Sequence, residues 1–129
     1  MNPTNIKLHK KSNTLELTFP ESGGDVNYTL TGEYLRVLSP SAEVRGHSPD
    51  QAVLQVGKSN VKMESIEGVG HYALKITFDD GHDSGLYTWN YLFDLSANYD
   101  KHWADYLAQL DAAQQSRDPD TSVVQFVDL

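Results

Sequence analysis

Between residues 72 and 78 every second side chain is large and apolar, and this alternation limits the possible folds more than any other feature. The alternating residues are Tyr72, Leu74, Ile76 and Phe78. Because successive side chains of a β-strand point to opposite faces, the pattern predicts a strand with one buried face. The Asp80-Gly81 pair that follows is a strong tight-turn signal, so we predict a hairpin with a return strand over residues 82–87.

The same kind of alternation predicts further strands nearer the N-terminus. Residues 6–8 and 15–19 alternate and are separated by the turn-forming pair Ser12-Asn13, which indicates a second hairpin. A short strand is predicted over residues 26–30, where apolar and polar side chains again alternate. Another is predicted to begin at residue 61 and to end near Gly68.

Two short helices are predicted to follow the third strand, within residues 32–45. Thr31 has the residue type that caps helix N-termini and is the predicted cap of the first helix. Ser39 is the predicted cap of the second, with Pro40 in its first position, where a proline is tolerated well. Gly46 is placed to end that helix.

The residue pattern in the last part of the chain predicts two more helices. Thr88 is a predicted N-cap, and apolar residues at helical spacing follow it. A longer helix with one apolar stripe is predicted to begin near Tyr99 and to end near Gln115. The order of strands, short helices, strands and helices is typical of an α+β domain, in which helices pack on an antiparallel-rich sheet.

A single domain is predicted over residues 1–115, with its core at about residues 4–97, because 129 residues suit one domain of ordinary size. The polar residues 116–122 have the composition of a linker and include Pro119. The apolar stretch over residues 123–127 could add a strand to the sheet, stay disordered or dock on a partner. Residues 116–129 are therefore predicted to form a linker and an apolar C-terminal tail.

Composition excludes several classes of function. The formal net charge of -8 gives no net attraction to nucleic acid or to anionic lipid. The absence of cysteine excludes disulfides, thiolate metal sites and a cysteine nucleophile. No apolar run approaches the ~18 residues of a membrane span, and residues 1–20 lack the apolar core of a signal peptide, so we expect a cytoplasmic protein.

The loop after the best strand combines a histidine with three carboxylates: Asp79, Asp80, His82 and Asp83. Such oxygen and imidazole groups could hold a divalent metal. The simpler interpretation is a tight turn whose polar side chains face water, since neighbouring strand residues point to opposite faces. Asp80, His82 and Ser84 could also be drawn as a catalytic triad, but the chain contains no G-x-S-x-G motif.

Two other groups of residues allow alternative interpretations. Arg36 and Arg45, together with Glu43, could form a semi-buried ionic network or partly exposed salt bridges, and Arg36 lies within an apolar helix turn. The many tyrosines and tryptophans could line the core with each polar tip satisfied, or could form an exposed aromatic contact surface.

Two segments of this chain resemble a domain of unknown function found at the N-terminus of γ-butyrobetaine hydroxylases. Free-standing bacterial versions of the domain exist, and others are fused to Mrp-type ATPases implicated in iron–sulfur cluster transfer. The resemblance covers roughly residues 4–97. The residues that carry it are Glu33-Tyr34-Leu35-Arg36, Ser39-Pro40-Ser41-Ala42-Glu43-Val44, Gly46-His47, and the run from Phe78 to Leu92 with Asp80-Gly81-His82 and Trp89.

The resemblance implies a fold and argues against a metal. In the hydroxylases, a Cys-x-Cys-x-x-Cys segment and the histidine of the Asp-Gly-His turn bind zinc. The positions that correspond to the cysteines are Ser39, Ser41 and Val44, and the histidine is His82. A lone imidazole does not hold structural zinc, which needs four protein ligands. We therefore expect His82 to be a hydrogen-bonding residue near Ser39 and Ser41, and no metal or other cofactor.

The leading expectation for function is a non-catalytic accessory or protein-interaction module with an unidentified protein partner. The oxygenase activity belongs to a catalytic domain of the hydroxylases, so the resemblance does not imply it here. One alternative, suggested by the fused ATPases, is a factor that assists iron–sulfur cluster or iron metabolism. Another is a small enzyme that uses His82 with a neighbouring aspartate as an acid–base pair. We expect neither nucleic acid nor membrane among the partners.

Overall fold

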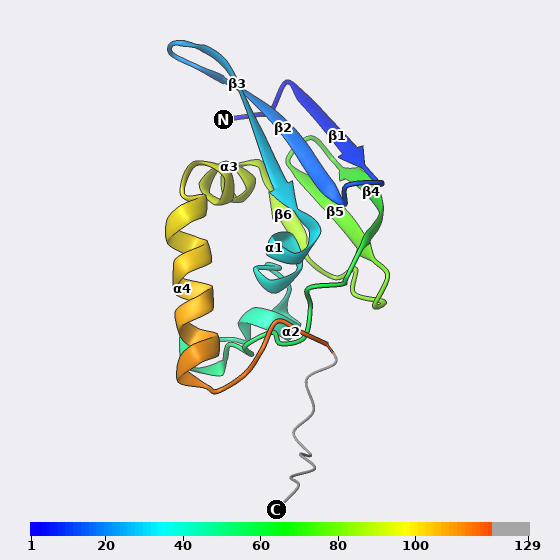
Figure 1. Ribbon diagram of the computed structural model, residues 1–129. Coiled ribbons are helices and arrows are strands. Elements are labelled where there is room, and N and C mark those ends of the chain that lie inside the picture. The colour runs from blue at the N-terminus through cyan, green and yellow to red at the C-terminus, as the bar shows by residue number, and fades with distance from the viewer. Residues whose placement is uncertain (120–129) are drawn as a thin grey trace, which may run out of the picture.

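The computed structural model describes residues 1–119, which form two antiparallel three-stranded sheets and four α-helices (Figure 1). This is the α+β class with antiparallel strands that the sequence predicts, divided into two sheets. The elements in chain order are β1 (Asn5–His9), β2 (Thr14–Glu21), β3 (Gly24–Thr31), α1 (Gly32–Val37), α2 (Ala42–Arg45), the 3-10 turn η1 (Pro49–Gln51), β4 (Met63–Val69), β5 (Ala73–Phe78), β6 (Leu86–Thr88), α3 (Trp89–Ala97) and α4 (Tyr99–Ala112).

The first sheet is a meander in the order β1-β2-β3. Leu17 lies opposite Ile6 on one side and opposite Tyr28 on the other. Leu15, Leu17 and Phe19 are fully buried, which is the inward face that the alternation predicts. The predicted hairpin is therefore confirmed, and the third strand begins two residues before the predicted start.

The second sheet has the order β4-β5-β6 and completes the main core. β5 contains the alternating apolar residues, and Leu74 lies opposite Tyr87 of β6. Leu74, Ile76 and Phe78 are each at most 3% exposed. They join the buried faces of the first sheet and residues of α1 and α3 in one apolar cluster.

Helices α1, α3 and α4 begin where the sequence predicts, and the helices cover the sheets from one side (Figure 1). The Thr31 hydroxyl accepts the N–H of Tyr34 at 3.1 Å, and the Thr88 hydroxyl accepts the N–H of Tyr91 at 3.2 Å. These bonds satisfy backbone donors that a helix start leaves free. A second small cluster, formed by Val37, Tyr106 and Leu110, packs α1 against α4.

Further boundaries differ from the prediction, and β4 begins at Met63, two residues after the predicted start. The second short helix begins at Ala42 with Ser41 in the cap position, so the predicted Ser39 cap with Pro40 in the first turn is wrong. The return strand comprises Leu86–Thr88 and not residues 82–87. The long helix ends at Ala112, three residues before the predicted end. The differences at the second short helix and at the return strand have one cause, a bond made by the Ser39 side chain, which is described below.

The chain turns back after α4 and contacts the body of the domain. Gly57 donates its N–H to the carbonyl of Ser116 at 2.9 Å. The guanidinium of Arg117 makes two hydrogen bonds to the Glu33 carboxylate, at 2.7 and 2.6 Å, and lies over the ring of Trp103. Residues 120–129, with the apolar stretch 123–127, lie outside the described residues. No helix within residues 1–119 is long and apolar enough to cross a membrane.

Asn13 joins the two sheets. It occupies the turn between β1 and β2 with a φ of 54°, a conformation that asparagine tolerates better than most residues. Its side-chain amide donates to the carbonyl of Val61 at 2.9 Å and accepts the N–H of Met63 at 2.8 Å. Gly32 lies directly behind, where a Cβ atom would be 2.5 Å from the Asn13 amide nitrogen. The turn of one sheet thus fixes the start of the other.

We expect Asn13→Gly to lower the free energy of unfolding by about 1–3 kcal/mol, because both backbone partners lose their hydrogen bonds in a part-buried site while the positive φ stays accessible. Chemical denaturation measures the effect. Ser12→Gly is the matched control, since it adds the same backbone freedom to the same turn and removes only an exposed hydrogen bond to Thr14. Equal losses in the two variants would contradict the bridging role.

Candidate functional site

The loop after β5 and the segment after α1 meet at a buried hydrogen bond between two side chains. The Ser39 hydroxyl lies 2.7 Å from His82 Nε2. Ser39 is 1% exposed and His82 is 8% exposed. Ser41 and Val44 border this bond from the start of α2 and are also buried. We call these four residues the Ser39–His82 corner, and its hydrogen bond is the one that the sequence predicts.

The turn after β5 points the imidazole inward. Gly81 has a φ of 87° and donates its N–H to the carbonyl of Phe78. The N–H of Phe78 in turn donates to the carbonyl of His82 at 3.0 Å. Gly85 then passes so close to Ser39 that a Cβ atom on it would be 2.5 Å from the hydroxyl oxygen. Residues 82–85 therefore wrap around Ser39, which explains why the return strand is short.

Ser41 leaves one polar atom of the corner unpaired. Its N–H donates to the Ser39 hydroxyl at 3.3 Å, but its own hydroxyl oxygen is buried without a hydrogen-bond partner in the described part of the chain. Its side chain makes no capping bond to α2. Val44 contributes an apolar side chain, and its carbonyl accepts the N–H of Val53 at 2.7 Å.

An ionic network lies next to the corner. Asp80 accepts hydrogen bonds from Arg36 and from Lys58, both at 2.9 Å, and Arg36 also donates to the side chain of Gln55. Arg36 is only 6% exposed, so its network is semi-buried, but the predicted network of Arg36, Arg45 and Glu43 is wrong, because Asp80 is the acid and Lys58 the second cation. Partial burial alone would raise the pKa of Asp80, but hydrogen bonds from Lys58, from the His82 N–H and from Arg36 lower that pKa to about 2.

The surroundings of the imidazole favour its neutral form. Burial, followed by the nearby charge of Arg36, lowers the pKa of His82 below its usual value. Glu43 opposes this effect weakly, because its carboxylate is 3.5 Å from His82 Nδ1 but its side chain is 73% exposed. A neutral imidazole donates from one nitrogen and accepts at the other, so the pair with Ser39 needs no net charge.

The corner has the residue types of a serine–histidine–acid triad but not its accessibility. Ser39, His82 and Glu43 follow one another at 2.7 and 3.5 Å. However, a nucleophile has to reach a substrate, and Ser39 is only 1% exposed, with its hydroxyl bound to His82 and closely approached by Gly85. The triad drawn from the sequence with Ser84 is not assembled, because the Asp80 side chain binds Arg36 and Lys58.

The acidic loop does not converge on a metal site. Asp79 accepts the N–H of Lys62 at 2.9 Å, and Asp83 pairs with Lys75 at 3.7 Å. No three histidine, aspartate or glutamate side chains within residues 1–119 gather around one point. The corner itself supplies one imidazole and two neutral hydroxyls, and these groups do not fit a structural zinc site with four protein ligands.

Two residues of the sequence motif lie apart from this corner. His47 is exposed and follows α2, and its backbone N–H donates to the Gln51 side chain. Trp89 begins α3 and donates its indole N–H to the carbonyl of His71 at 2.7 Å. Neither shares a hydrogen bond or an ion pair with the corner in the part of the chain that the structure describes.

Sequence reasoning missed the tyrosines that anchor the segment after α1. Tyr87 donates its hydroxyl to the carbonyl of Leu35 at 2.5 Å, and Tyr91 donates to the carbonyl of Leu38 at 2.6 Å. Both carbonyls belong to the last turns of α1, where helices leave acceptors free. The signal in the sequence was only the density of tyrosine, which does not say which carbonyl each hydroxyl reaches.

Comparison with known proteins places these observations in a family. The family model described as gamma-butyrobetaine hydroxylase-like, N-terminal, matches residues 6–93. An NMR solution structure shows a protein that is 54% identical to this chain. The match covers 97% of this chain and 96% of that protein, with a TM-score of 0.78. A second NMR structure is 45% identical, covers 98% and 93%, and has a TM-score of 0.74.

A crystal structure extends the likeness to a more distant relative. It is of a protein with unknown function from Acidithiobacillus ferrooxidans that belongs to the DUF971 family. That protein is 33% identical, covers 74% of this chain and 93% of its own length, and has a TM-score of 0.58. No curated protein matches this chain.

We expect His82→Ala to lower the free energy of unfolding at pH 8 by about 1–3 kcal/mol, because it leaves the buried Ser39 hydroxyl without its partner. The loss is measured by chemical denaturation. His9→Ala is the control, since the His9 side chain is 47% exposed and pairs with Glu16 at the surface. An unchanged stability of His82→Ala would contradict the structural role.

The same variant has a pH signature. The folded state lowers the pKa of His82, so the unfolded state binds its proton first, and stability is lost as pH falls below the unfolded value of 6.5. The stability difference between wild type and His82→Ala should therefore shrink between pH 7.5 and pH 5. A constant difference would show that the imidazole is not held neutral.

Proposed function

This chain belongs to the gamma-butyrobetaine hydroxylase-like N-terminal family, and from that premise we propose that it works as a non-catalytic module that docks on a partner protein. One observation carries the proposal: several polar side chains of the family motif are engaged by other side chains of the fold. Ser39 is engaged by His82, and Asp80 by Arg36 and Lys58. Groups used in this way hold a shape, whereas catalysis needs groups that reach a substrate.

The surface offers apolar side chains that suit docking. The core of a protein interface is poor in charged residues and rich in large apolar ones. The exposed large apolar residues of the described chain are Met1, Val26, Val53, Val56, Tyr72, Leu86 and Leu107. Val53, which precedes β4 in the sequence, and Tyr72, which follows it, are each 55% exposed. The acidic net charge of -8 favours a partner that is basic around the contact.

We further infer that hydrogen bonds and packing replace, in this chain, the zinc site of the related hydroxylases. The Ser39–His82 bond and the close approach of Gly85 support this, since they close the corner without a metal. The unpaired hydroxyl of Ser41 supports it too, because a buried polar atom without a partner fits a position whose ligand role has been lost.

The docking proposal predicts a position-dependent, competable crosslink. Benzoyl-phenylalanine is placed at Val53, Val56, Tyr72 or Leu86 in the intact chain, and the protein is irradiated in an extract of its native host. At least one position should crosslink a single protein in a saturable way, because a docked partner covers it. Mass spectrometry identifies the product, and an excess of unlabelled chain should abolish it.

The same probe at Glu64, an exposed position on β4, is the control for random contact. Crosslinks of equal yield at Glu64 and at the apolar positions, or crosslinks that unlabelled chain does not reduce, would contradict the docking proposal.

The replacement proposal predicts that a zinc site can be restored. The triple variant Ser39→Cys, Ser41→Cys, Val44→Cys should bind one zinc ion per chain, because three thiolates would then surround the imidazole of His82 and complete four ligands. Zinc is measured by mass spectrometry on protein purified without a metal-binding tag.

Adding His82→Ala to the triple variant should weaken zinc binding, since the fourth ligand is then lost. Stoichiometric zinc in the wild type would contradict the replacement proposal. A triple variant that folds but holds no zinc would show that these positions do not converge on one point.

A further inference from the structure

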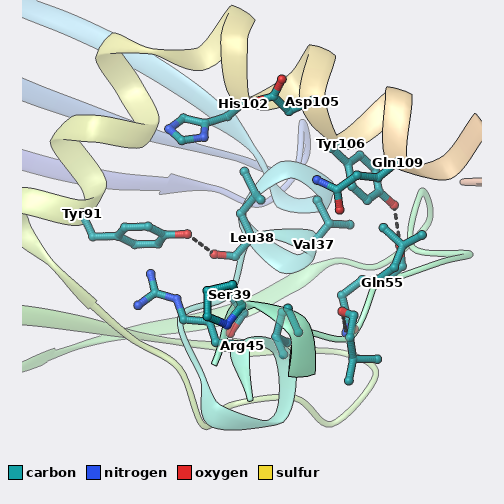
Figure 2. Close-up of a pocket in the computed structure, with 15 residues that line it drawn as sticks. Val37, Leu38, Ser39, Arg45, Gln55, Tyr91, His102, Asp105, Tyr106 and Gln109 are labelled. Atoms are coloured by element: carbon teal, nitrogen blue, oxygen red, sulfur yellow. Dashed lines mark hydrogen bonds between the residues drawn. The ribbon is translucent and has the colours of Figure 1, made fainter. Parts of the chain in front are cut away.

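A cavity of about 380 Å³ lies between α4 and the segment that runs from the end of α1 to Gln55. Figure 2 shows Tyr91 and Arg45 at one end of it, and Tyr106 and Gln109 at the other. This volume is within the range of small-molecule sites, about 300–1,000 Å³. The cavity is separate from the buried Ser39–His82 bond, although Ser39 also lines it.

Apolar side chains form much of the wall. Val37 and Tyr106, both buried, belong to the small cluster between α1 and α4, and Leu54 packs against that cluster. Val44 and Val53 add apolar surface from the opposite side. A ligand that fills this space therefore needs an apolar body.

Arg45 is the unusual group of the cavity. The chain has three arginines, and Arg36 and Arg117 each bind a carboxylate. Arg45 forms no ion pair with the described residues, and its guanidinium carbon lies 4.5 Å from the centre of the Tyr91 ring. Tyr91 is itself fixed, since its hydroxyl donates to the carbonyl of Leu38. Arg45 is an exposed residue at this end of the cavity, and its contact with the fixed Tyr91 ring orients the guanidinium, whose several N–H donors suit an anion.

The other charged groups set a limit on the anion. His102 Nε2 already contacts the carboxylate of Asp94 at 2.9 Å, so this ring nitrogen is not available to an anion. Asp105 also lines the cavity, and the whole chain has a net charge of -8. A negative field repels an anion in proportion to its charge, so a doubly charged phosphate is disfavoured more than a single carboxylate.

We propose that this cavity binds a small organic monocarboxylate, with its carboxylate on Arg45 and its apolar body against Val37, Leu54 and Tyr106. The planar guanidinium matches a carboxylate with two parallel hydrogen bonds. This site rests on the cavity and on Arg45, and of the exposed apolar residues in the docking proposal only Val53 also lines it.

The test is an NMR titration of the intact, isotope-labelled chain with hexanoate. Saturable shifts are expected at the backbone amides of Val37, Arg45, Leu54 and Tyr106. Hexanamide has the same shape without the charge and should bind at least tenfold more weakly. Hexyl phosphate, which carries more negative charge, should also bind more weakly than hexanoate.

Arg45→Gln should weaken hexanoate binding at least tenfold while the rest of the spectrum shows a folded chain. Lys7→Gln is the matched control, because it removes one positive charge from β1, which contributes no residue to the cavity wall. Its affinity for hexanoate should be unchanged. The proposal is overturned by equal binding of hexanoate and hexanamide, by unchanged affinity in Arg45→Gln, or by the absence of saturable shifts at the cavity.

Discussion

The hydrogen bond between Ser39 and His82 fixes how two distant parts of the chain meet. It joins the segment after α1 to the loop after β5, 43 positions apart in the sequence. Once this bond forms, the carboxylate of Asp80 is brought to Arg36, and Gly85 has to pass close behind Ser39. A long loop that makes such contacts loses much conformational freedom, so several weak bonds have to act together to hold it.

The ionic network shows why the polar groups of this region come as a set. Arg36 is nearly buried, and a buried charge is tolerated only when it is paired and hydrogen-bonded. Asp80 supplies the charge, Gln55 supplies a neutral acceptor, and Lys58 keeps the carboxylate ionised. Removing one side chain of this network would leave its partners unpaired in a poorly solvated site. Charged groups that depend on one another in this way stabilise a shape more readily than they perform chemistry.

The sequence predicted the elements whose signals are local. The apolar alternation of β5 and the caps at Thr31 and Thr88 depend on neighbouring residues only, and the structure contains each of them. The start of α2 and the length of β6 were mispredicted, because both are decided by the side chain of Ser39. A serine before a proline has the appearance of a helix cap, and nothing near it in sequence shows that a histidine 43 positions later takes its hydroxyl.

The candidate site was predictable to the same extent. The family motif led to the pairing of His82 with Ser39, but neither composition nor spacing indicated that Arg45 would line a cavity without an ion-pair partner among the described residues. That cavity depends on α4, which lies at Tyr99–Ala112, whereas the family model matches residues 6–93. The crystal structure from Acidithiobacillus ferrooxidans covers 74% of this chain, and the two NMR structures cover 97% and 98%. The part that the family model matches thus builds the closed corner and most of the cavity lining, and α4 supplies the remaining wall of the cavity. Features that distinguish this chain from the broader family are therefore to be sought along α4, where Tyr106 closes one end of the cavity and donates to the carbonyl of Gln55.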